Sequence, residues 1–386
     1  MPSKISDAKV LIVDDAEFSR EVIGKVFEKN GFSNINFAEN GIVALQKTEE
    51  IEPDIVLLDL IMPELDGYEY CKRIRTSPKF FTTPILVQSA ADRPDEISKA
   101  FQAGATDFVS KPINADEVMA RSRVHLENKF LMQDLTDYRR RVESELKSAK
   151  ETQKAILPSD TEITEIQNQY GMDIEKYFEP SSELGGDFWG IKGISHNEVA
   201  FYTVDFSGHG VTAALNTFRI HTILQEQNSF SLPPGVFLSL INSHLNNLLS
   251  VGQFATMFYG VLNTNNNTFR YSSAGAPNPI VTDANGKTKI IDGSGVPLGI
   301  SKDALYENKE IDFPAGSVLM LYSDALLETR NDKGDFLQER SFAGILEENK
   351  GGESKKLMQE VLRKFSSHAK DNLIDDLTIN IYRRLG

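Results

Sequence analysis

Short apolar segments and helical segments alternate through the first third of the chain. The apolar segments are KVLIVDD (9–15), NINFA (34–38), DIVLLDL (54–60), PILVQSA (84–90) and 106–110. The helical segments between them cover 17–30, 41–50, 67–76 and 94–103. Nearly continuous apolar strands that alternate with helices are typical of a parallel sheet covered on both faces. We therefore predict a doubly wound α/β domain with a five-stranded parallel sheet over residues 1–124.

A long helical pattern follows over residues 114–157, with no Gly or Pro before Pro158. Apolar residues recur in it with the spacing of a seven-residue repeat. They are Leu131, Leu135, Tyr138, Val142, Ala149 and Ile156. Glu145 and Thr152 interrupt the repeat. The pattern predicts a helical linker over 125–160 that pairs with a second copy as a coiled coil, giving a homodimer; the alternative is that this stripe packs onto the chain's own domains.

The pattern changes again after about residue 165, where strand-like runs surround two helical stretches. The runs are EVAFYTVDF, ATMFYGVLN, FRYSSAG, VLMLYSD and LTINIYRR, and the helical stretches cover 211–227 and 234–250. Turn-forming residues at 263–267 and 283–286 indicate antiparallel hairpins. These features predict a mixed α+β domain over residues 161–386.

Composition and charge narrow the function classes. The formal net charge is −15, which argues against a nucleic-acid partner or an anionic membrane surface. No apolar run reaches the roughly 18 residues that a membrane span needs. The single cysteine, Cys71, allows no disulfide within the chain. Together these features favour a protein of the reducing cytoplasm.

Three carboxylates lie at the ends of two predicted strands: Asp14, Asp15 and Asp59. Clustered carboxylates repel one another unless a cation lies among them, so the group indicates a Mg²⁺ site. A carboxylate can also accept a phosphoryl group, with Lys111 and Ser89 at neighbouring strand ends contacting its oxygens. The alternative is that such acids only cap helices or face water.

The stretches LIVDD, LLDLIMPELDG, PILVQSA and DFVSKP resemble the receiver domain of the response-regulator family. The resemblance implies that a histidine kinase phosphorylates Asp59. It also implies that Asp14, Asp15 and Asp59, with the Ile61 carbonyl, bind Mg²⁺. Ser89 and Lys111 would sense the phosphate, Phe108 would be the aromatic switch residue, and the Lys111–Pro112 peptide bond would be cis.

Four short acidic motifs mark the C-terminal part: GGDFWG (185–190), VDFSGHG (204–210), YSDALLE (322–328) and DDLT (375–378). Each aspartate lies at or just past a strand-like run. Carboxylates without His or Cys ligands suit Mg²⁺ or Mn²⁺, and two such ions about 3.5–4 Å apart can clamp a phosphoryl group. Asp and Gly are also ordinary turn residues, and the sequence alone leaves open whether the four motifs meet.

These motifs, with AGAPNP, PLGI and the S-x-x-GGDF pattern, resemble the PP2C-type protein phosphatases, in the bacterial branch typified by stage II sporulation protein E. The resemblance implies an αββα sandwich that binds two Mn²⁺ or Mg²⁺ ions. Asp187 and Asp205 would bind or bridge both ions, with the Phe206 carbonyl as an added ligand. Asp324 and Asp375 would bind the first ion, with Asp376 as the substitute for Asp375.

Three positions carry further expectations. His209 either donates a proton to the leaving serine oxygen or holds the GHG turn. Ala325 replaces a glycine common in the family, and Gly190 replaces a common acidic residue. The segment ETQKAILPS is similar to an element that precedes these phosphatase domains.

The combined features predict a response regulator in which phosphorylation of Asp59 controls a metal-dependent serine/threonine phosphatase. By family resemblance the substrate is a phosphorylated anti-sigma-factor antagonist of the STAS type. The competing hypothesis is a non-enzymatic adaptor that binds a sigma or anti-sigma factor. The sequence does not identify the cognate kinase, the preferred metal or the sign of regulation.

Overall fold

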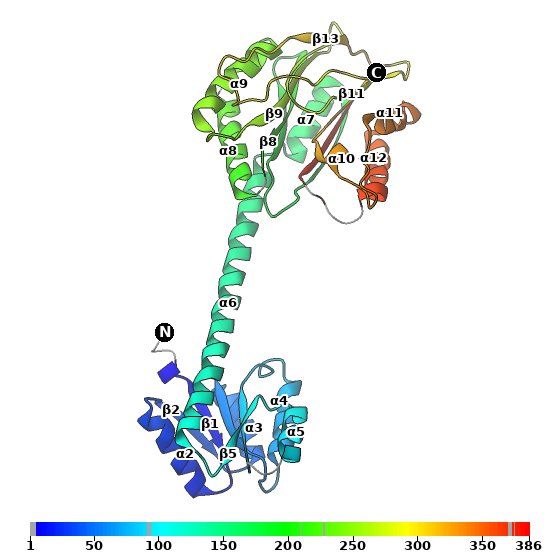
Figure 1. Ribbon diagram of the computed structural model, residues 1–386. Helices are drawn as coiled ribbons and strands as arrows, with labels where there is room; N and C mark the ends of the chain where they lie inside the picture. Colours follow the sequence, from blue (N-terminus) through cyan, green and yellow to red (C-terminus); the bar gives the residue numbers. More distant parts are fainter. Residues whose placement is uncertain (1–4, 91–93, 209, 227, 370–372, 374) are drawn as a thin grey trace. The chain divides into compact units, whose positions relative to one another are not determined.

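The computed structural model describes residues 5–386 apart from 91–93, 209, 227, 370–372 and 374 (Figure 1). The chain divides into two compact units, Met1–Val142 and Glu143–Gly386. The sheets of these units confirm both predicted fold classes. No helix of the described residues is long and apolar enough to cross a membrane.

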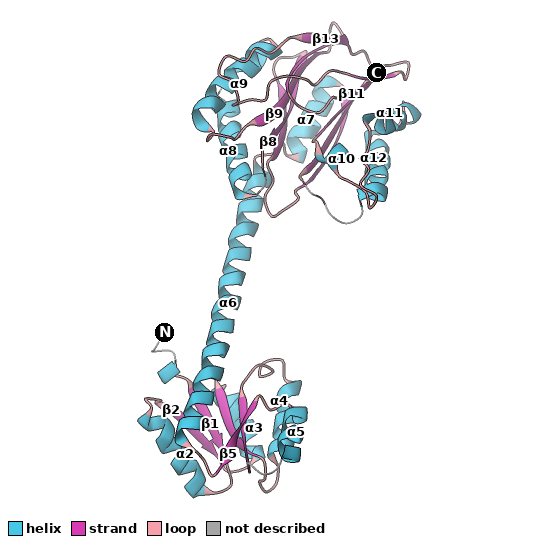
Figure 2. Cartoon of the chain, viewed as in Figure 1, coloured by secondary structure: helices cyan, strands magenta, loops and turns pink. Residues whose placement is uncertain are grey.

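The first unit contains a five-stranded parallel sheet in the order β2-β1-β3-β4-β5 (Figure 2). Its strands are β1 (Lys9–Val13), β2 (Asn34–Ala38), β3 (Ile55–Asp59), β4 (Ile85–Ala90) and β5 (Asp107–Lys111). Its helices are α2 (Glu17–Lys29), α3 (Gly41–Ile51), α4 (Gly67–Thr76), α5 (Pro94–Ala103) and the first part of α6 (Ala115–Ala155).

Each face of this sheet has its own core, because successive side chains of a strand point to opposite faces. Leu11 and Val13 of β1 pack with residues of α3, α4 and α5. Val10 and Ile12 pack with residues of α2 and α6. The strands are therefore buried on both sides, which explains why their sequences are apolar runs and not alternating patterns.

Helix α6 has 41 residues and continues from the first unit into the second. Leu131, Leu135 and Tyr138 of the predicted coiled-coil stripe are all more than half exposed. Ile156, which follows the helix, packs against a core of the second unit. The stripe is thus exposed in its N-terminal half, whereas its last position contacts the chain's own domain.

The second unit contains two five-stranded sheets, ordered β13-β10-β9-β8-β7 and β12-β11-β14-β15-β6. The first consists of β7 (Asp187–Gly193), β8 (Glu198–Phe206), β9 (Ala255–Asn263), β10 (Thr268–Ala274) and β13 (Lys309–Asp312). The second consists of β6 (Met172–Glu179), β11 (Ile280–Thr282), β12 (Thr288–Ile290), β14 (Val318–Tyr322) and β15 (Leu377–Arg384). The turns predicted at 263–267 and 283–286 join the antiparallel pairs β9–β10 and β11–β12.

Helices cover the outer face of each sheet, as the predicted sandwich requires. Helices α8 (Val211–Glu226) and α9 (Pro234–Leu248) pack on the first sheet, and η1 (Asn228–Ser231) lies between them in sequence. Helices α10 (Ala325–Glu328), α11 (Glu339–Glu348) and α12 (Ser354–Ala369) pack on the second sheet. Trp189, Phe258 and Tyr382 belong to the core between the two sheets.

Helix α7 (Asp160–Tyr170) was not predicted from the sequence. Its N-terminus carries a capping box, in which the Ser159 hydroxyl accepts from the Glu162 amide and the Glu162 carboxylate accepts from the Ser159 amide. A Ser followed three residues later by Glu is a sequence signature of a helix start. This signal was available directly after Pro158, where the helical pattern over 114–157 ends.

Candidate active site

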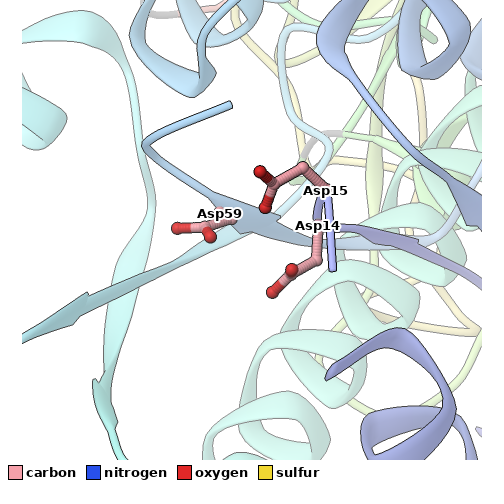
Figure 3. Close-up of side chains that lie close together, drawn as sticks. All are labelled: Asp14, Asp15 and Asp59. Atoms are coloured by element: carbon pink, nitrogen blue, oxygen red, sulfur yellow. The ribbon is translucent and has the colours of Figure 1, made fainter. Parts of the chain in front are cut away.

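The ends of β1 and β3 bring three carboxylates together in the first unit (Figure 3). Ligand oxygens of Asp14, Asp15 and Asp59 all lie within 4.8 Å of one another. Asp14 is held in place by the Ala16 amide, 2.9 Å from Oδ1, and by the Ser19 hydroxyl, 2.6 Å from Oδ2. The three oxygens form a compact set of hard ligands of the kind that Mg²⁺ prefers.

Lys111 is the cation paired with this carboxylate group. Its Nζ lies 2.7 Å from Oδ2 of Asp59, which is nearly buried. Burial raises the pKa of Asp59, the Lys111 ammonium opposes that rise, and Asp14 adds to it. Asp59 thus has an anionic neighbour in Asp14 and a fixed cation in Lys111. A bound phosphoryl group on Asp59 would have the same cation within reach.

The remaining receiver positions lie on neighbouring elements. Ser89 is buried in β4, where the preceding residue, Gln88, is in register with Asp59. Phe108 of β5 lies between the Phe101 ring, 6.4 Å away, and the Arg121 guanidinium, 5.2 Å away. Ile61 follows β3 with an exposed side chain. The Lys111–Pro112 peptide bond is cis.

In the second unit, Asp187 and Asp205 stand opposite each other on adjacent strands. Asp187 begins β7 and is paired in register with Asp205 of β8. The Thr378 hydroxyl of the other sheet donates to Asp187 Oδ2 at 2.5 Å. Both aspartates line a small cavity with Thr256 and Ser323. The two carboxylates therefore meet at the end of the sandwich where both sheets contribute side chains.

Asp324 and Asp375 approach the same end from the second sheet. Asp324 lies two residues after the end of β14 and directly precedes α10. Burial and the charge of Asp375 raise the pKa of Asp324 to about 6. Asp375 precedes β15 and accepts a hydrogen bond from the Asp376 amide at 2.8 Å. All four predicted aspartates thus converge on one region from separate parts of the sequence.

Asp376 has different contacts from its neighbour Asp375. One oxygen, Oδ1, accepts from the amide of Ser181 at 2.7 Å and from its hydroxyl at 3.0 Å. The other, Oδ2, accepts from the Gly186 amide at 2.5 Å. The buried carboxylate therefore organises the loop that leads to Asp187. These contacts favour Asp375 over Asp376 as the candidate ligand.

Burial and mutual repulsion together destabilise the charged forms of this group of carboxylates. Burial raises the pKa of Asp187 well above its usual value, and the charge of Asp205 raises it further. Asp205 is affected in the same way by burial and by Asp324 and Asp375. Divalent cations would relieve this repulsion, and the donors are all hard oxygens, so the residues fit Mg²⁺ or Mn²⁺. The four aspartates of the second unit are farther apart than the receiver carboxylates. Among the described residues, the receiver site alone has three acidic ligand atoms within 4.8 Å of one another.

Gln153 of α6 contacts the same loop and was missed by the sequence analysis. Its Nε2 donates to the Gly185 carbonyl at 2.6 Å, and its Oε1 accepts from the Gly185 amide at 3.2 Å. The Nε2 also lies 3.2 Å from the Thr217 hydroxyl of α8. The only sequence signal was the segment ETQKAILPS, whose glutamine this is. The side chain joins the end of α6 to the loop two residues before Asp187.

Two further predicted site positions are His209 and the backbone carbonyl of Phe206. His209 lies outside the described residues, between Gly208 and Gly210, which both have positive φ. The Phe206 carbonyl lies close to Gly186, where an added Cβ would come within 3.0 Å of its oxygen.

Both departures from the family pattern have a local explanation. Ala325 begins α10 and is not among the described non-glycine residues with positive φ, so its side chain causes no backbone strain there. An added Cβ at Gly190 would lie 2.2 Å from the buried Tyr202 ring. An acidic side chain at this position would therefore displace Tyr202, and Gly190 fits the packing of this chain.

A larger cleft of about 410 Å³ opens beside Asp324. It shares Thr256, Ala276 and Pro277 with the small cavity at Asp187 and Asp205. Glu328 and Glu339 also line it. Because Asp324 itself lines this cleft, the cleft reaches the carboxylate group.

Two family descriptions match separate parts of the chain. The response regulator receiver domain matches residues 10–123, and stage II sporulation protein E (SpoIIE) matches residues 195–385. Among curated proteins, the chemotaxis protein CheY of Bacillus subtilis (strain 168) is 41 % identical over 111 residues. That match covers 29 % of this chain and 91 % of CheY, so it concerns the first unit alone.

Solved structures include relatives of the second unit. The SiaA-PP2C domain of Pseudomonas aeruginosa has a TM-score of 0.56 at 19 % identity, covering 64 % of this chain and 98 % of its own. This similarity is one of fold. The PP2C phosphatase domain of SpoIIE from Bacillus subtilis, with a fragment of its regulatory domain, has a TM-score of 0.49 at 15 % identity and covers 56 % of this chain and 64 % of its own.

The first unit has the receiver fold, its carboxylate group and a close receiver relative. The second unit has the PP2C sandwich and the SpoIIE match. The chain therefore belongs to the response regulators, with an N-terminal receiver domain and a C-terminal phosphatase domain of the SpoIIE family, which is of the PP2C type.

Proposed function

We propose that this protein is a metal-dependent protein serine/threonine phosphatase controlled by phosphorylation of Asp59 in its receiver domain. The observation that carries the proposal is the convergence of Asp187, Asp205, Asp324 and Asp375 on one end of the sandwich. Burial and mutual repulsion make this group unfavourable without a cation, which supports a role in metal binding. We further propose domain limits of 1–124, 125–160 and 161–386, and a cytoplasmic location.

In the proposed phosphatase site, Asp187 and Asp205 would hold two Mn²⁺ or Mg²⁺ ions, and Asp324 and Asp375 would contribute further ligands to the first of them. The Phe206 carbonyl is a further candidate ligand. When bound, the ions supply an activated water and positive charge around the phosphoryl group. Thr378 orients Asp187 through its hydroxyl, and Asp376 holds the loop before it. His209 is the candidate proton donor to the leaving serine oxygen.

In the proposed receiver reaction, an oxygen of Asp59 forms a bond to the phosphorus while the bond from phosphorus to the kinase histidine breaks. Asp14, Asp15 and the Ile61 carbonyl hold Mg²⁺ beside it. Lys111, already 2.7 Å from Asp59, neutralises part of the added charge, and Ser89 donates to another phosphate oxygen. Phe108 responds to this change next to Arg121 on α6.

The proposed substrate is a serine-phosphorylated anti-sigma-factor antagonist of the STAS type, a choice that rests on the family resemblance. The rival function is an adaptor that binds a sigma or anti-sigma factor without catalysis. An adaptor has no need for four carboxylates that repel one another, so their presence favours the enzyme. A measurement of inorganic phosphate released from the phosphorylated antagonist in the presence of Mn²⁺ distinguishes the enzyme from the adaptor. The enzyme turns the antagonist over repeatedly, whereas an adaptor binds it and leaves the phosphate in place.

A further inference from the structure

Five exposed apolar side chains lie on three segments of the phosphatase domain, and we call them the rim patch. They are Val211, Leu215, Leu248, Val251 and Ile300. Leu215 is 55 % exposed and Ile300 is 57 % exposed. Single exposed apolar residues are normal on protein surfaces, whereas a contiguous group of them marks an interaction site. The contacts between the three segments show whether the five residues form one group.

A hydrogen bond links the first two segments. Val211 and Leu215 are four residues apart in α8 and so share one face of that helix. Arg219, one turn further along the same face, donates to the Leu248 carbonyl at the end of α9, 3.2 Å away. The exposed face of α8 therefore continues onto the end of α9 and the adjoining Val251.

The third segment lies against the second. Ala255 and Leu298 exchange backbone hydrogen bonds of 2.9 and 2.8 Å. An added Cβ at Gly299 would lie 2.8 Å from a methyl carbon of Leu249, so the two chains touch there. Ile300 therefore adjoins the end of α9, and the rim patch is one surface made of three separate stretches of sequence.

This surface adjoins the candidate active site. Ser207, two residues after Asp205, donates its amide to the Phe254 carbonyl at 2.9 Å, and its hydroxyl accepts from the Phe254 amide at 3.0 Å. Asp205 itself is paired in register with Thr256. The segments that carry the rim patch are thus anchored at the strand ends that hold the candidate metal ligands.

We propose that the rim patch is the docking surface for the folded protein that carries the phosphoserine. This inference rests on the proposed phosphatase function. A phosphoserine that reaches Asp187 and Asp205 brings the surface of its own protein over the segments next to them. The patch combines three stretches of sequence and is therefore a broad surface. Such a surface fits the apolar surface of a folded partner better than it fits a single extended peptide. The stripe that we assign to self-association, by contrast, lies on α6.

The test uses the full chain, with Leu215→Gln and Ile300→Gln combined to make the two exposed positions polar. The matched control is Val236→Gln, an exposed position near the other end of α9, about 18 Å from Leu248 along the helix. The three substrates are p-nitrophenyl phosphate, a STAS-type antagonist phosphorylated on serine, and the phosphopeptide cut from it. Light scattering records the mass of each variant.

Wild type and the control should hydrolyse the folded antagonist with a kcat/KM at least about tenfold above that for its phosphopeptide. The double variant should lose that advantage and keep wild-type rates on p-nitrophenyl phosphate. Equal rates on antagonist and phosphopeptide in wild type, or full antagonist activity in the double variant, would overturn the inference. A change of molecular mass in the double variant would also overturn it, since the patch would then join two copies. A wild-type protein inactive on p-nitrophenyl phosphate counts against the proposed function instead.

Discussion

Individual carboxylates in this chain have contrasting surroundings that decide what each can do. Asp376 accepts three hydrogen bonds and holds a loop, whereas Asp187 and Asp205 face each other with raised pKa values. Neutral substitutions at the two kinds of position should therefore have different effects. Replacement of a repelling carboxylate removes a metal ligand and also removes repulsion.

The first prediction concerns Asp187→Asn, with Asp324→Asn as a second variant. Each should lower Mn²⁺-dependent turnover by at least about a hundredfold, because a ligand charge is lost. Metal-free Asp187→Asn should melt no lower than wild type, since the Thr378 hydroxyl can still donate to the new side chain. Phosphate release and thermal melts measure the two effects, and EDTA should abolish wild-type activity. Wild-type turnover in either variant would show that the metal site is misassigned.

The second prediction concerns the receiver. Acetyl phosphate with Mg²⁺ should phosphorylate wild type and leave Asp59→Ala unmodified, because Asp59 is the buried carboxylate paired with Lys111. Mass spectrometry of the intact protein detects the added phosphate. Glu64→Ala, at a nearby loop residue, is the control and should be modified like wild type. Phosphate on Asp59→Ala would contradict the assignment.

For single residues, the sequence was most informative where recognisable motifs follow one another in a fixed order along the chain. The receiver carboxylates were predicted because they lie at the ends of recognisable apolar strands, and the structure brings Asp14, Asp15 and Asp59 together. The family resemblance named Asp375 as the ligand and Asp376 as its substitute, and the surroundings of the two residues were not predictable from their adjacent positions. These surroundings depend on which carboxylate meets Ser181 and Gly186, nearly 200 positions earlier in the chain.

Among the elements, α6 has the most specific relation to the phosphatase site. Gln153 accepts from the amide and donates to the carbonyl of Gly185, which precedes Gly186 and Asp187. The position of the end of α6 therefore affects the loop that carries a candidate metal ligand. A polar residue on a long amphipathic helix is usually a solvated one, so the resemblance of ETQKAILPS to a family element was the only sequence signal for Gln153.

The third prediction tests this contact with Gln153→Ala. Loss of two hydrogen bonds, worth about 2 kcal/mol together, should raise the Mn²⁺ concentration for half-maximal activity by about 10- to 30-fold. Activity on p-nitrophenyl phosphate should return at high Mn²⁺. Lys154→Ala, an exposed neighbour on the same helix, should behave like wild type. An unchanged Mn²⁺ activation curve for Gln153→Ala would refute the coupling.

The elements also show why the sequence prediction was incomplete. The parallel and antiparallel strands were predicted well because burial on one or both faces leaves a clear apolar pattern. Helix α7 was missed because no helix was predicted between Pro158 and the strand-like runs of the second unit, although Ser159 and Glu162 form a capping box. The pairing of β6 with β15 joins residues about 200 positions apart, and no local pattern specifies it.

On the scale of the whole molecule, α6 is the one described element with residues in both compact units. Its exposed residues Leu131, Leu135 and Tyr138 would remain in water in a monomer. Burial of such a stripe against a second copy is favourable, and the interruptions at Glu145 and Thr152 would keep the pairing weak. We propose that receiver phosphorylation changes this pairing and thereby the phosphatase rate.

The fourth prediction is that Leu135→Asp combined with Val142→Asp gives monomers whose activity no longer responds to beryllofluoride. Charged residues in the apolar seam oppose pairing of two helices. Gln133→Asp combined with Ser144→Asp adds the same charge on another face of α6 and should leave a responsive dimer. Light scattering with a parallel phosphatase assay measures both properties. A seam variant that stays dimeric, or a monomer that responds fully, would exclude the linker as the transmitting element.

The measurement that tests the central proposal most directly is Mn²⁺-dependent phosphate release with and without beryllofluoride, which mimics the aspartyl phosphate. Wild type and Asp59→Ala are compared on the same serine-phosphorylated antagonist. We predict that beryllofluoride raises the rate of wild type several-fold and leaves Asp59→Ala unchanged at its basal rate. Equal rates with and without beryllofluoride in wild type, or the same response in Asp59→Ala, would contradict control of the phosphatase by the receiver.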